Sequence, residues 1–188
     1  MASVPTQPYV PVAEYLNTSY RPDLEYVDGV LMERSSRTIL QALLQASLCH
    51  YFAAFEIGCR FVVLPRVRTE IVRFSEYRLP DVQLCAVPGP SGRIMDAVPM
   101  AVIEIFSPAD TMSEMLERFR DYAAIGTPYI IQLDPENCIA RRFDKGSLIE
   151  TEFTALEIGD RKISFDSKAI FETLRAKHRQ FTGEDPAR

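Results

Sequence analysis

The sequence predicts an α/β domain in which helices pack on the faces of a mixed β-sheet. Runs of β-forming residues bounded by Pro or Gly recur along the chain, and two long segments between them carry apolar residues at helical spacing. The 188 residues suffice for one hydrophobic core. We therefore expect a single domain over residues 23–180, after an extended segment (1–22) and before a frayed tail (181–188).

The first regular element predicted is a β-hairpin. Repeated prolines before residue 12 and the pair Arg21-Pro22 disfavour regular structure in the N-terminal segment. Residues 24–27 and 30–33 are β-forming and flank Asp28-Gly29, a dipeptide that accepts the positive φ angles of a type I′ turn.

The middle of the chain predicts a buried helix and the central strands. Ser35 or Ser36 can cap a largely apolar helix that runs through Phe52, with Gly58 just beyond its end. β-forming runs follow, and they predict strands over residues 61–64, 79–87 and 98–106, with a strand or hairpin across 67–74.

The last part of the chain predicts an amphipathic helix, further strands and a final helix. Asp110 can cap the amphipathic helix, and Gly126 with Pro128 ends it. The final helix is expected from Ser167 to about Lys177. The strands between these helices are expected over residues 129–133, 139–143, 148–153 and 162–165.

Composition limits the classes of function. A net charge of -5 gives no overall attraction to nucleic acid, so DNA binding would require a local patch. The cysteines form no CxxC pair and only two histidines are present, which disfavours a zinc cluster. Without a secretory signal or membrane span, we expect a soluble cytoplasmic protein. Four neighbouring arginines are either a DNA-binding patch or ordinary solvated charge: Arg66, Arg68, Arg73 and Arg78.

Two carboxylates stand where buried strands are expected. Glu104 interrupts an apolar run, and Asp81 opens another directly after Pro80. A buried carboxylate costs several kcal/mol unless it is paired, protonated or bound to a cation. If the two strands are neighbours with both acids on one face, the acids form a site for Mg²⁺, which prefers carboxylate oxygen.

A purely structural explanation stands beside the metal site. An Asp at a strand end is often a turn or capping group, and a strand Glu often pairs with an arginine, here Arg118 or Arg120.

Three strings together resemble the Uma-type family of bacterial putative restriction endonucleases, a domain of unknown function within the PD-(D/E)XK nuclease superfamily. They are Leu79-Pro80-Asp81-Val82, the run from Val102 to Pro108, and Glu117-Arg118-Phe119-Arg120-Asp121-Tyr122, followed by Gly126 and Asp134-Pro135. The resemblance also includes the hairpin and extends over residues 24–143.

The resemblance implies a restriction-endonuclease-like fold and a metal-dependent phosphodiesterase site. Asp81 and Glu104 match the two acidic motifs, so with the backbone carbonyl of Ile105 they would hold one or two Mg²⁺ or Mn²⁺ ions. Glu25 of the hairpin is a weaker candidate ligand, since a Glu beside a turn more often faces solvent. Arg118 occupies the position that matches the family's catalytic lysine.

Arg118 distinguishes this chain from the family pattern. Lysine can orient or deprotonate water, whereas arginine stays protonated and acts as a fixed cation. Arg118 also has Glu114 and Asp121 at helical spacing, which would make it a surface ion-pair partner. Further departures are Ser36-Arg37-Thr38 in place of a usual histidine and Tyr129-Ile130-Ile131 in place of Glu-Tyr-Trp.

Two functions are therefore weighed from the sequence. The first is a Mg²⁺-dependent endonuclease that acts on DNA through Asp81, Glu104 and Arg118. The second is a nuclease fold without catalysis that serves as a binding or assembly module. Strand edges after Phe143 also predict a symmetric homodimer.

Overall fold

The computed structural model describes residues 9–34, 37–73, 75–158 and 161–184, and a six-stranded sheet forms its centre. The strand order is β10-β9-β8-β7-β6-β3. The β7–β8 pair is parallel and the other four pairs are antiparallel, so the predicted mixed sheet is confirmed. Its strands are β3 (Phe61–Leu64), β6 (Val82–Ala86), β7 (Ala101–Ile105), β8 (Tyr129–Asp134), β9 (Ile139–Asp144) and β10 (Ser147–Glu150).

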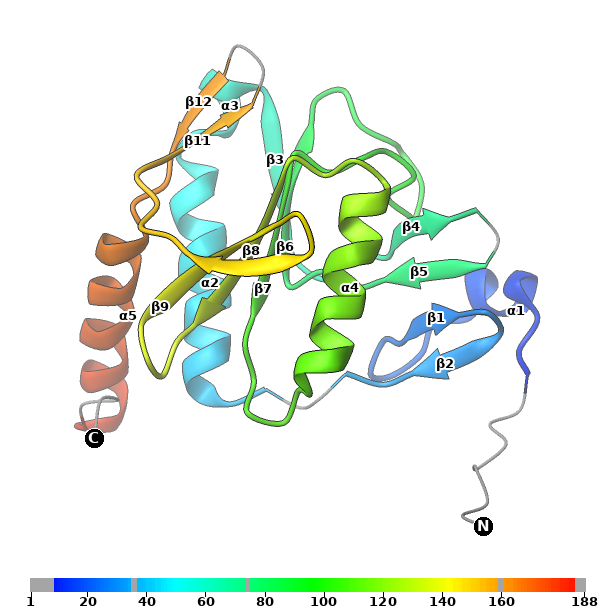
Figure 1. Ribbon diagram of the computed structural model, residues 1–188, viewed down its shortest axis with the longest axis horizontal. Helices are drawn as coiled ribbons and strands as arrows, with labels where there is room; N and C mark the ends of the chain where they lie inside the picture. The colour runs from blue at the N-terminus through cyan, green and yellow to red at the C-terminus, as the bar shows by residue number, and fades with distance from the viewer. Residues whose placement is uncertain (1–8, 35–36, 74, 159–160, 185–188) are drawn as a thin grey trace.

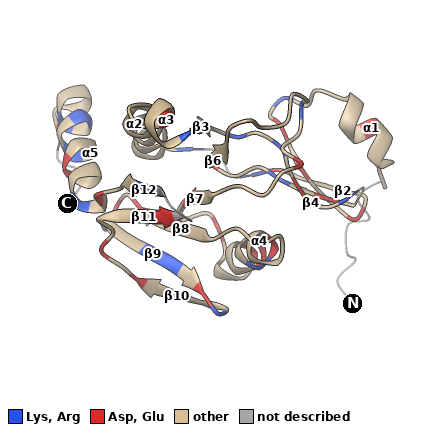
Figure 2. Ribbon diagram, turned by 90° about the horizontal axis from the view of Figure 1, so that it is seen from above, with Lys and Arg blue, Asp and Glu red and all other residues tan. Residues whose placement is uncertain are grey.

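Helices cover both faces of this sheet. α2 (Ile39–Ala53) and α5 (Ser167–Thr182) lie on one face, and α4 (Met112–Ala124) lies on the other (Figures 1 and 2). Parallel strands need a crossover connection, and α4 provides it between β7 and β8. Along β7, Ile103 and Ile105 pack into the core on the α2 side, whereas Val102 packs with Phe119 of α4. Strand alternation therefore directs Glu104 toward α4.

A second, four-stranded sheet carries the N-terminal hairpin. Its order is β2-β1-β5-β4. Asp28 and Gly29 have φ angles of 46° and 87°, as a type I′ turn requires, so the predicted hairpin is confirmed. The sheet lies at the end of the molecule opposite α5 (Figure 1). Its strands are β1 (Glu25–Val27), β2 (Val30–Met32), β4 (Thr69–Val72) and β5 (Glu76–Arg78).

The N-terminal segment is not extended throughout, so the prediction of an extended segment over residues 1–22 is wrong for part of it. Residues Val12–Asn17 form helix α1, which follows Pro11. Proline is compatible with a helix start, because its fixed φ suits the first turn and no N–H is needed there. Tyr15 anchors the helix, since its buried ring stacks on Tyr26 with the centroids 4.8 Å apart.

Threonines, rather than the expected residues, cap the two central helices. Thr38 accepts a hydrogen bond from the backbone of Gln41 at the start of α2, and Thr111, not Asp110, does the same for Glu114 in α4. Each pair forms a capping box, in which both residues satisfy a backbone N–H of the other. The serines expected to cap α2, residues 35 and 36, lie outside the described residues.

Smaller differences concern short elements. Gly58 lies inside the short helix α3 (Glu56–Cys59) rather than beyond the end of α2. The sequence prediction missed β5 as a separate strand, and it also missed β11 (Ala155–Ile158), which pairs with β12 (Arg161–Ser164). Strands this short offer few residues in which alternation can be recognised.

The C-terminal helix is longer than predicted. α5 extends to Thr182 and ends at Gly183, whose φ of 77° closes the helix in the left-handed conformation. The predicted frayed tail is therefore wrong for residues 181 and 182, and residues 185–188 lie outside the described part of the chain. Among the helices described, none has both the length and the apolar character needed to cross a bilayer.

Candidate active site

Asp81 and Glu104 lie opposite each other at the centre of the molecule. β6 and β7 pair with Val82 opposite Ile103, and the next position in this register sets Asp81 opposite Glu104. Residues opposite each other in an antiparallel pair share a face of the sheet. The N–H of Ile105 donates to Asp81 Oδ2 at 2.8 Å. Both acids are buried, and their roles in catalysis and metal binding remain predictions.

Arg34 compensates the charge of both acids. Its Nη2 atom lies 2.8 Å from Glu104 Oε2, and its Nη1 atom lies 3.4 Å from Asp81 Oδ1. The side chain of Arg34 is itself buried. The arginine partner expected for Glu104 is thus neither Arg118 nor Arg120. The sequence did not identify Arg34 as this partner, because Asp81 and Glu104 lie far from it along the chain.

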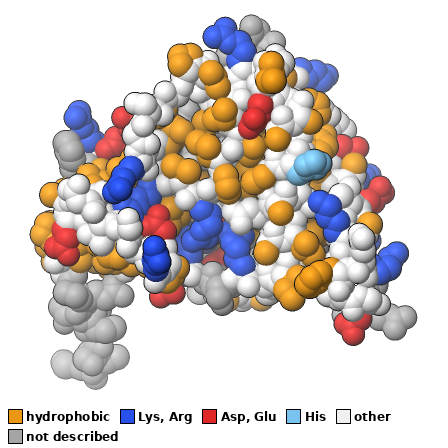
Figure 3. Space-filling model, turned by 180° about the vertical axis from the view of Figure 1, so that it is seen from behind, with side chains coloured by type: hydrophobic (Ala, Val, Ile, Leu, Met, Phe, Trp, Pro, Cys, Tyr) orange, Lys and Arg blue, Asp and Glu red, His pale blue; other side chains and the backbone are white. Residues whose placement is uncertain are grey.

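Two further arginines approach Asp81. Arg37 forms an ion pair with Asp81 Oδ1, and Arg66 Nη1 lies 3.8 Å from the same oxygen. The three arginines surround a cavity of about 10 Å³, close to the volume that one water needs. Lys and Arg side chains gather where the two sheets meet (Figure 3). The remaining residues lining the cavity are Gln41, Ile105, Ser107 and Asp110.

Tyr122 of α4 holds Glu104 from the helix side. Its hydroxyl donates to Glu104 Oε1 at 2.7 Å. Burial raises the pKa of Glu104, and the positive charge of Arg34 opposes this shift. Burial and the negative charge of Glu104 raise the pKa of Tyr122 well above its ordinary value. Tyr122 therefore stays protonated as a permanent donor to the carboxylate.

Arg118 is buried on α4 beside this site. Its Nη2 atom pairs with Asp110 Oδ1 at 3.7 Å, so Asp110 replaces the expected partners Glu114 and Asp121. The charge of Arg118 is close enough to lower the pKa of Glu104. Arg118 thus supplies positive charge to the acid pair through space rather than as a surface ion pair.

Glu25 is buried and already has partners, contrary to the expectation that a hairpin Glu faces solvent. It accepts hydrogen bonds from the N–H of Leu79 and from Arg78 Nη1, each at 3.1 Å. Arg34 Nη1 lies 3.8 Å away. Glu25 therefore lies next to the acid pair, but its oxygens are committed to the hairpin sheet.

Arg78 links the hairpin sheet to α4 through buried ion pairs. Besides Glu25, it contacts Asp121 at 2.6 Å and Glu76 at 3.2 Å. Glu76 has its pKa raised to about 7, because burial, a hydrogen bond to Asp121 and the charge of Asp121 outweigh the attraction of Arg78. Glu76 therefore keeps a proton up to near-neutral pH, beside the arginine that it shares with Asp121.

The raised pKa of Glu76 predicts a pH-dependent stability. The ordinary value is 4.5, so the folded protein binds this proton more tightly than the unfolded chain. The free energy of unfolding is then expected to fall as pH rises from about 4.5 to about 7. Urea denaturation at pH 5.5 and pH 8 should show this fall, and Glu76→Gln should reduce it. Equal pH dependence in both proteins would contradict the assignment.

The donor atoms at the acid pair fit a hard divalent cation. Glu104 Oε2 is buried and accepts no hydrogen bond of good geometry within the described residues. With Asp81 and the carbonyl of Ile105, it would offer the oxygen ligands that Mg²⁺ prefers. No group of three or more His, Cys, Asp and Glu side chains suited to a metal occurs in the described chain. Such a cation would share or replace the compensating charge of Arg34.

One solved structure agrees with this fold over most of its length. A putative nuclease belonging to DUF820 from Anabaena variabilis ATCC 29413 has a crystal structure that matches with a TM-score of 0.72 and 14% identity, over 88% of this chain and 99% of that chain. This likeness supports the predicted restriction-endonuclease-like fold. The cryo-EM structure of a DrdV-DNA complex matches with a TM-score of 0.38 and 16% identity, over 76% of this chain and 12% of that chain.

The family assignment comes from the sequence. No curated protein matches the chain. The Uma2 family model, described as putative restriction endonuclease, matches residues 12–165, which is well over half of the chain and includes Asp81, Glu104 and Arg118. The chain therefore belongs to the Uma2 family of putative restriction endonucleases.

Proposed function

We propose that this protein is a metal-dependent endonuclease that hydrolyses phosphodiester bonds in DNA. The observation that carries the proposal is the pair of buried carboxylates, Asp81 and Glu104, opposed on neighbouring strands. Membership of a family of putative restriction endonucleases supports a nuclease and the use of divalent metal in general. Two acids that share a site with hard oxygen donors are suited to metal-assisted hydrolysis.

The residues around the acid pair have separate roles in this proposal. Mg²⁺ or Mn²⁺ held by Asp81, Glu104 and the carbonyl of Ile105 would lower the pKa of a bound water and neutralise charge on the phosphate. Arg37 and Arg66 would bind non-bridging oxygens of the scissile phosphate, because guanidinium groups match phosphate geometry.

Other contacts keep the two carboxylates in position. Tyr122 donates to Glu104, and Gln45 Nε2 donates to the backbone carbonyl of Asp81 at 2.7 Å. Arg118 would stabilise developing negative charge but cannot act as a base, because arginine remains protonated.

A plasmid assay tests the proposal. The purified protein is incubated with supercoiled plasmid in Mg²⁺ or Mn²⁺, with EDTA as the control. Conversion to nicked or linear DNA only in the presence of metal is expected. An absence of metal-dependent conversion across a range of pH and salt would contradict catalysis.

A second candidate function is DNA binding without cleavage. It is favoured by Arg118, which stands at the position that matches the family's catalytic lysine. General acid–base catalysis contributes about 10²–10⁴-fold, so Arg118→Lys is expected to increase cleavage by at least about tenfold. Arg118→Met is the matched variant that lacks the charge, and it should lower cleavage. If Arg118→Lys leaves the protein inactive while DNA binding persists, the binding function is favoured instead.

We also propose a homodimer formed along the edge of the six-stranded sheet. β10 is the terminal strand and pairs with β9. Ile149 at this edge is 51% exposed, and an edge strand can pair with a second copy of itself. The N–H of Thr151 donates to Ala140, so strand alternation turns the N–H of Ile149 toward β9 and that of Glu150 toward the open edge. Sedimentation velocity should give the mass of a dimer for the wild type and of a monomer for Glu150→Pro, since proline removes this edge donor. A monomeric wild type would contradict this contact.

A further inference from the structure

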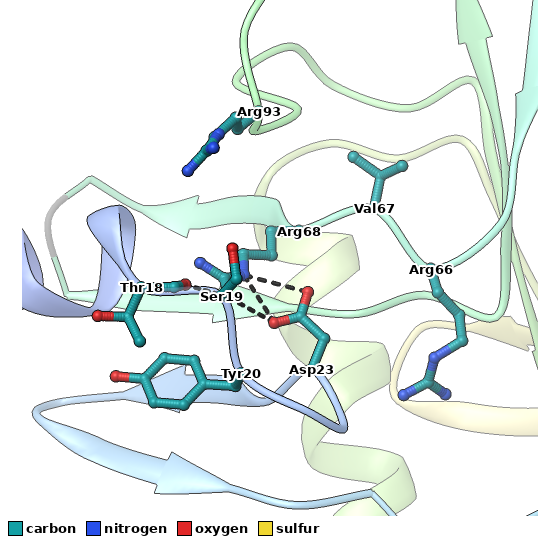
Figure 4. Close-up of a pocket in the computed structure, with 8 residues that line it drawn as sticks. All are labelled: Thr18, Ser19, Tyr20, Asp23, Arg66, Val67, Arg68 and Arg93. Atoms are coloured by element: carbon teal, nitrogen blue, oxygen red, sulfur yellow. Dashed lines mark hydrogen bonds and ion pairs between the residues drawn. The ribbon is translucent and has the colours of Figure 1, made fainter.

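A larger pocket lies between the segment that follows α1 and the loops before β4 and after β6. Its volume is about 350 Å³, which is within the range of small-molecule sites. Figure 4 shows its walls: Tyr20 and Asp23 lie at the bottom of the view, Arg93 at the top and Arg66 at the right. The pocket is lined by Thr18, Ser19, Tyr20, Asp23, Arg66, Val67, Arg68 and Arg93.

Arg66 connects this pocket to the candidate active site. Its side chain lines both the pocket and the small cavity at Asp81. Its Nη1 atom lies 3.8 Å from Asp81 Oδ1, an oxygen that Arg34 and Arg37 also approach, so the charge of Arg66 is only partly compensated. An anion bound beside Arg66 would therefore be stabilised at the junction of the two cavities.

The charge of the pocket is positive although the chain is acidic. Arg68 is neutralised by Asp23, whose Oδ1 lies 2.5 Å from Arg68 Nη2, and its guanidinium also lies over the ring of Tyr15. Arg66 and Arg93 remain as two cations across the opening, and Arg93 is exposed. Guanidinium groups are suited to phosphate recognition, and these two could each contact a phosphate oxygen.

The uncharged lining also suits a nucleotide. Ser19 places a hydroxyl group at the wall, and Tyr20 offers an aromatic ring (Figure 4). The hydroxyl of Thr18 is already used, because it donates to the carbonyl of Glu14 at 2.7 Å. Hydroxyls can donate to phosphate and sugar oxygens, and an aromatic face can stack on a base without regard to its identity. The pocket therefore combines guanidinium groups for phosphate, a hydroxyl group for sugar oxygens and an aromatic ring for a base.

We propose that this pocket binds the phosphate and nucleotide that lie next to the scissile phosphate in a DNA strand, with Arg66 and Arg93 as the phosphate ligands. The proposal rests on the proposed nuclease function, because it takes Asp81 and Glu104 as the place of cleavage. It adds to the candidate active site a separate binding subsite for the neighbouring nucleotide.

Fluorescence anisotropy with fluorescein-labelled DNA tests the subsite apart from cleavage. Binding is measured in EDTA, which prevents metal-dependent hydrolysis, with a duplex and with a single strand of the same sequence. Arg93→Gln is expected to weaken binding on the order of fivefold at low salt and to reduce the slope of log K against log salt by about one. Arg93→Lys should restore the slope, because it restores the charge.

The control is Lys168→Gln, which removes an exposed cation from α5 at the far end of the molecule. It should leave the slope unchanged. If Arg93→Gln binds DNA as the wild type does, or if the wild type shows no salt-dependent binding, the subsite proposal is wrong. Cleavage is scored separately on plasmid, so a protein that binds through Arg93 but never cleaves would support the subsite and contradict the nuclease function.

Discussion

Asp81→Asn and Glu104→Gln are each expected to reduce metal-dependent plasmid cleavage by about 10³-fold. A catalytic metal contributes several kcal/mol to transition-state stabilisation, and about 4 kcal/mol corresponds to this factor. Both substitutions keep the size of the side chain and remove the charge that would hold the cation. Glu104→Gln also keeps an oxygen that can accept the hydrogen bond from Tyr122. The measurement is the initial rate of plasmid nicking.

Glu157→Gln is the matched control for these two variants. Glu157 is a carboxylate on β11 whose side chain is 69% exposed and which pairs only with Lys162 among the described residues. It should cleave at the wild-type rate. Thermal denaturation of all three variants separates a lost site from a lost fold. Full cleavage by folded Asp81→Asn would contradict the assigned site.

Arg34→Met is expected to lower the free energy of unfolding by about 3–5 kcal/mol, the cost of leaving buried charges without their partner. Asp81 and Glu104 would then face each other without the guanidinium that lies 3.4 Å and 2.8 Å from their oxygens. Because a divalent cation would supply the missing charge, Mg²⁺ or Mn²⁺ should raise the melting temperature of Arg34→Met more than that of the wild type. Thermal denaturation with and without metal measures both effects.

The control for Arg34 is Lys162→Met, which removes a cation whose side chain is 73% exposed. An exposed ion pair contributes about 0–1 kcal/mol, so little change in stability and no specific response to metal are expected. Equal stabilisation of Arg34→Met and wild type by metal would mean that Arg34 and the cation do not compete for the same carboxylates.

Local patterns predicted much of the fold and the central pair of acids. Asp28-Gly29 marked the hairpin because few dipeptides adopt two positive φ angles. Helix α4 was clear because its apolar residues repeat with the helical period. Asp81 and Glu104 stood out because each belongs to an apolar run, and antiparallel pairing of β6 and β7 brings them together.

The charge partners could not be predicted, because they are set by tertiary contacts. Arg34 reaches the acids only after the hairpin sheet meets the six-stranded sheet. The four arginines weighed as a DNA-binding patch or as solvated charge are dispersed for the same reason. Arg78 is 2% exposed among four carboxylates, Arg68 is bound to Asp23, and Arg66 lines the cavities. Spacing along the sequence does not distinguish these three environments.

The compensation of buried charge across two sheets has a consequence for how the protein unfolds. Arg34 follows the hairpin sheet, whereas Asp81 directly precedes β6 and Glu104 belongs to β7 of the six-stranded sheet. Separating the sheets would leave ionised groups of both signs without partners in a poorly hydrated interior before any apolar core is lost. Partial opening is therefore disfavoured, and amide hydrogens in β1 and in β7 should exchange through the same cooperative event.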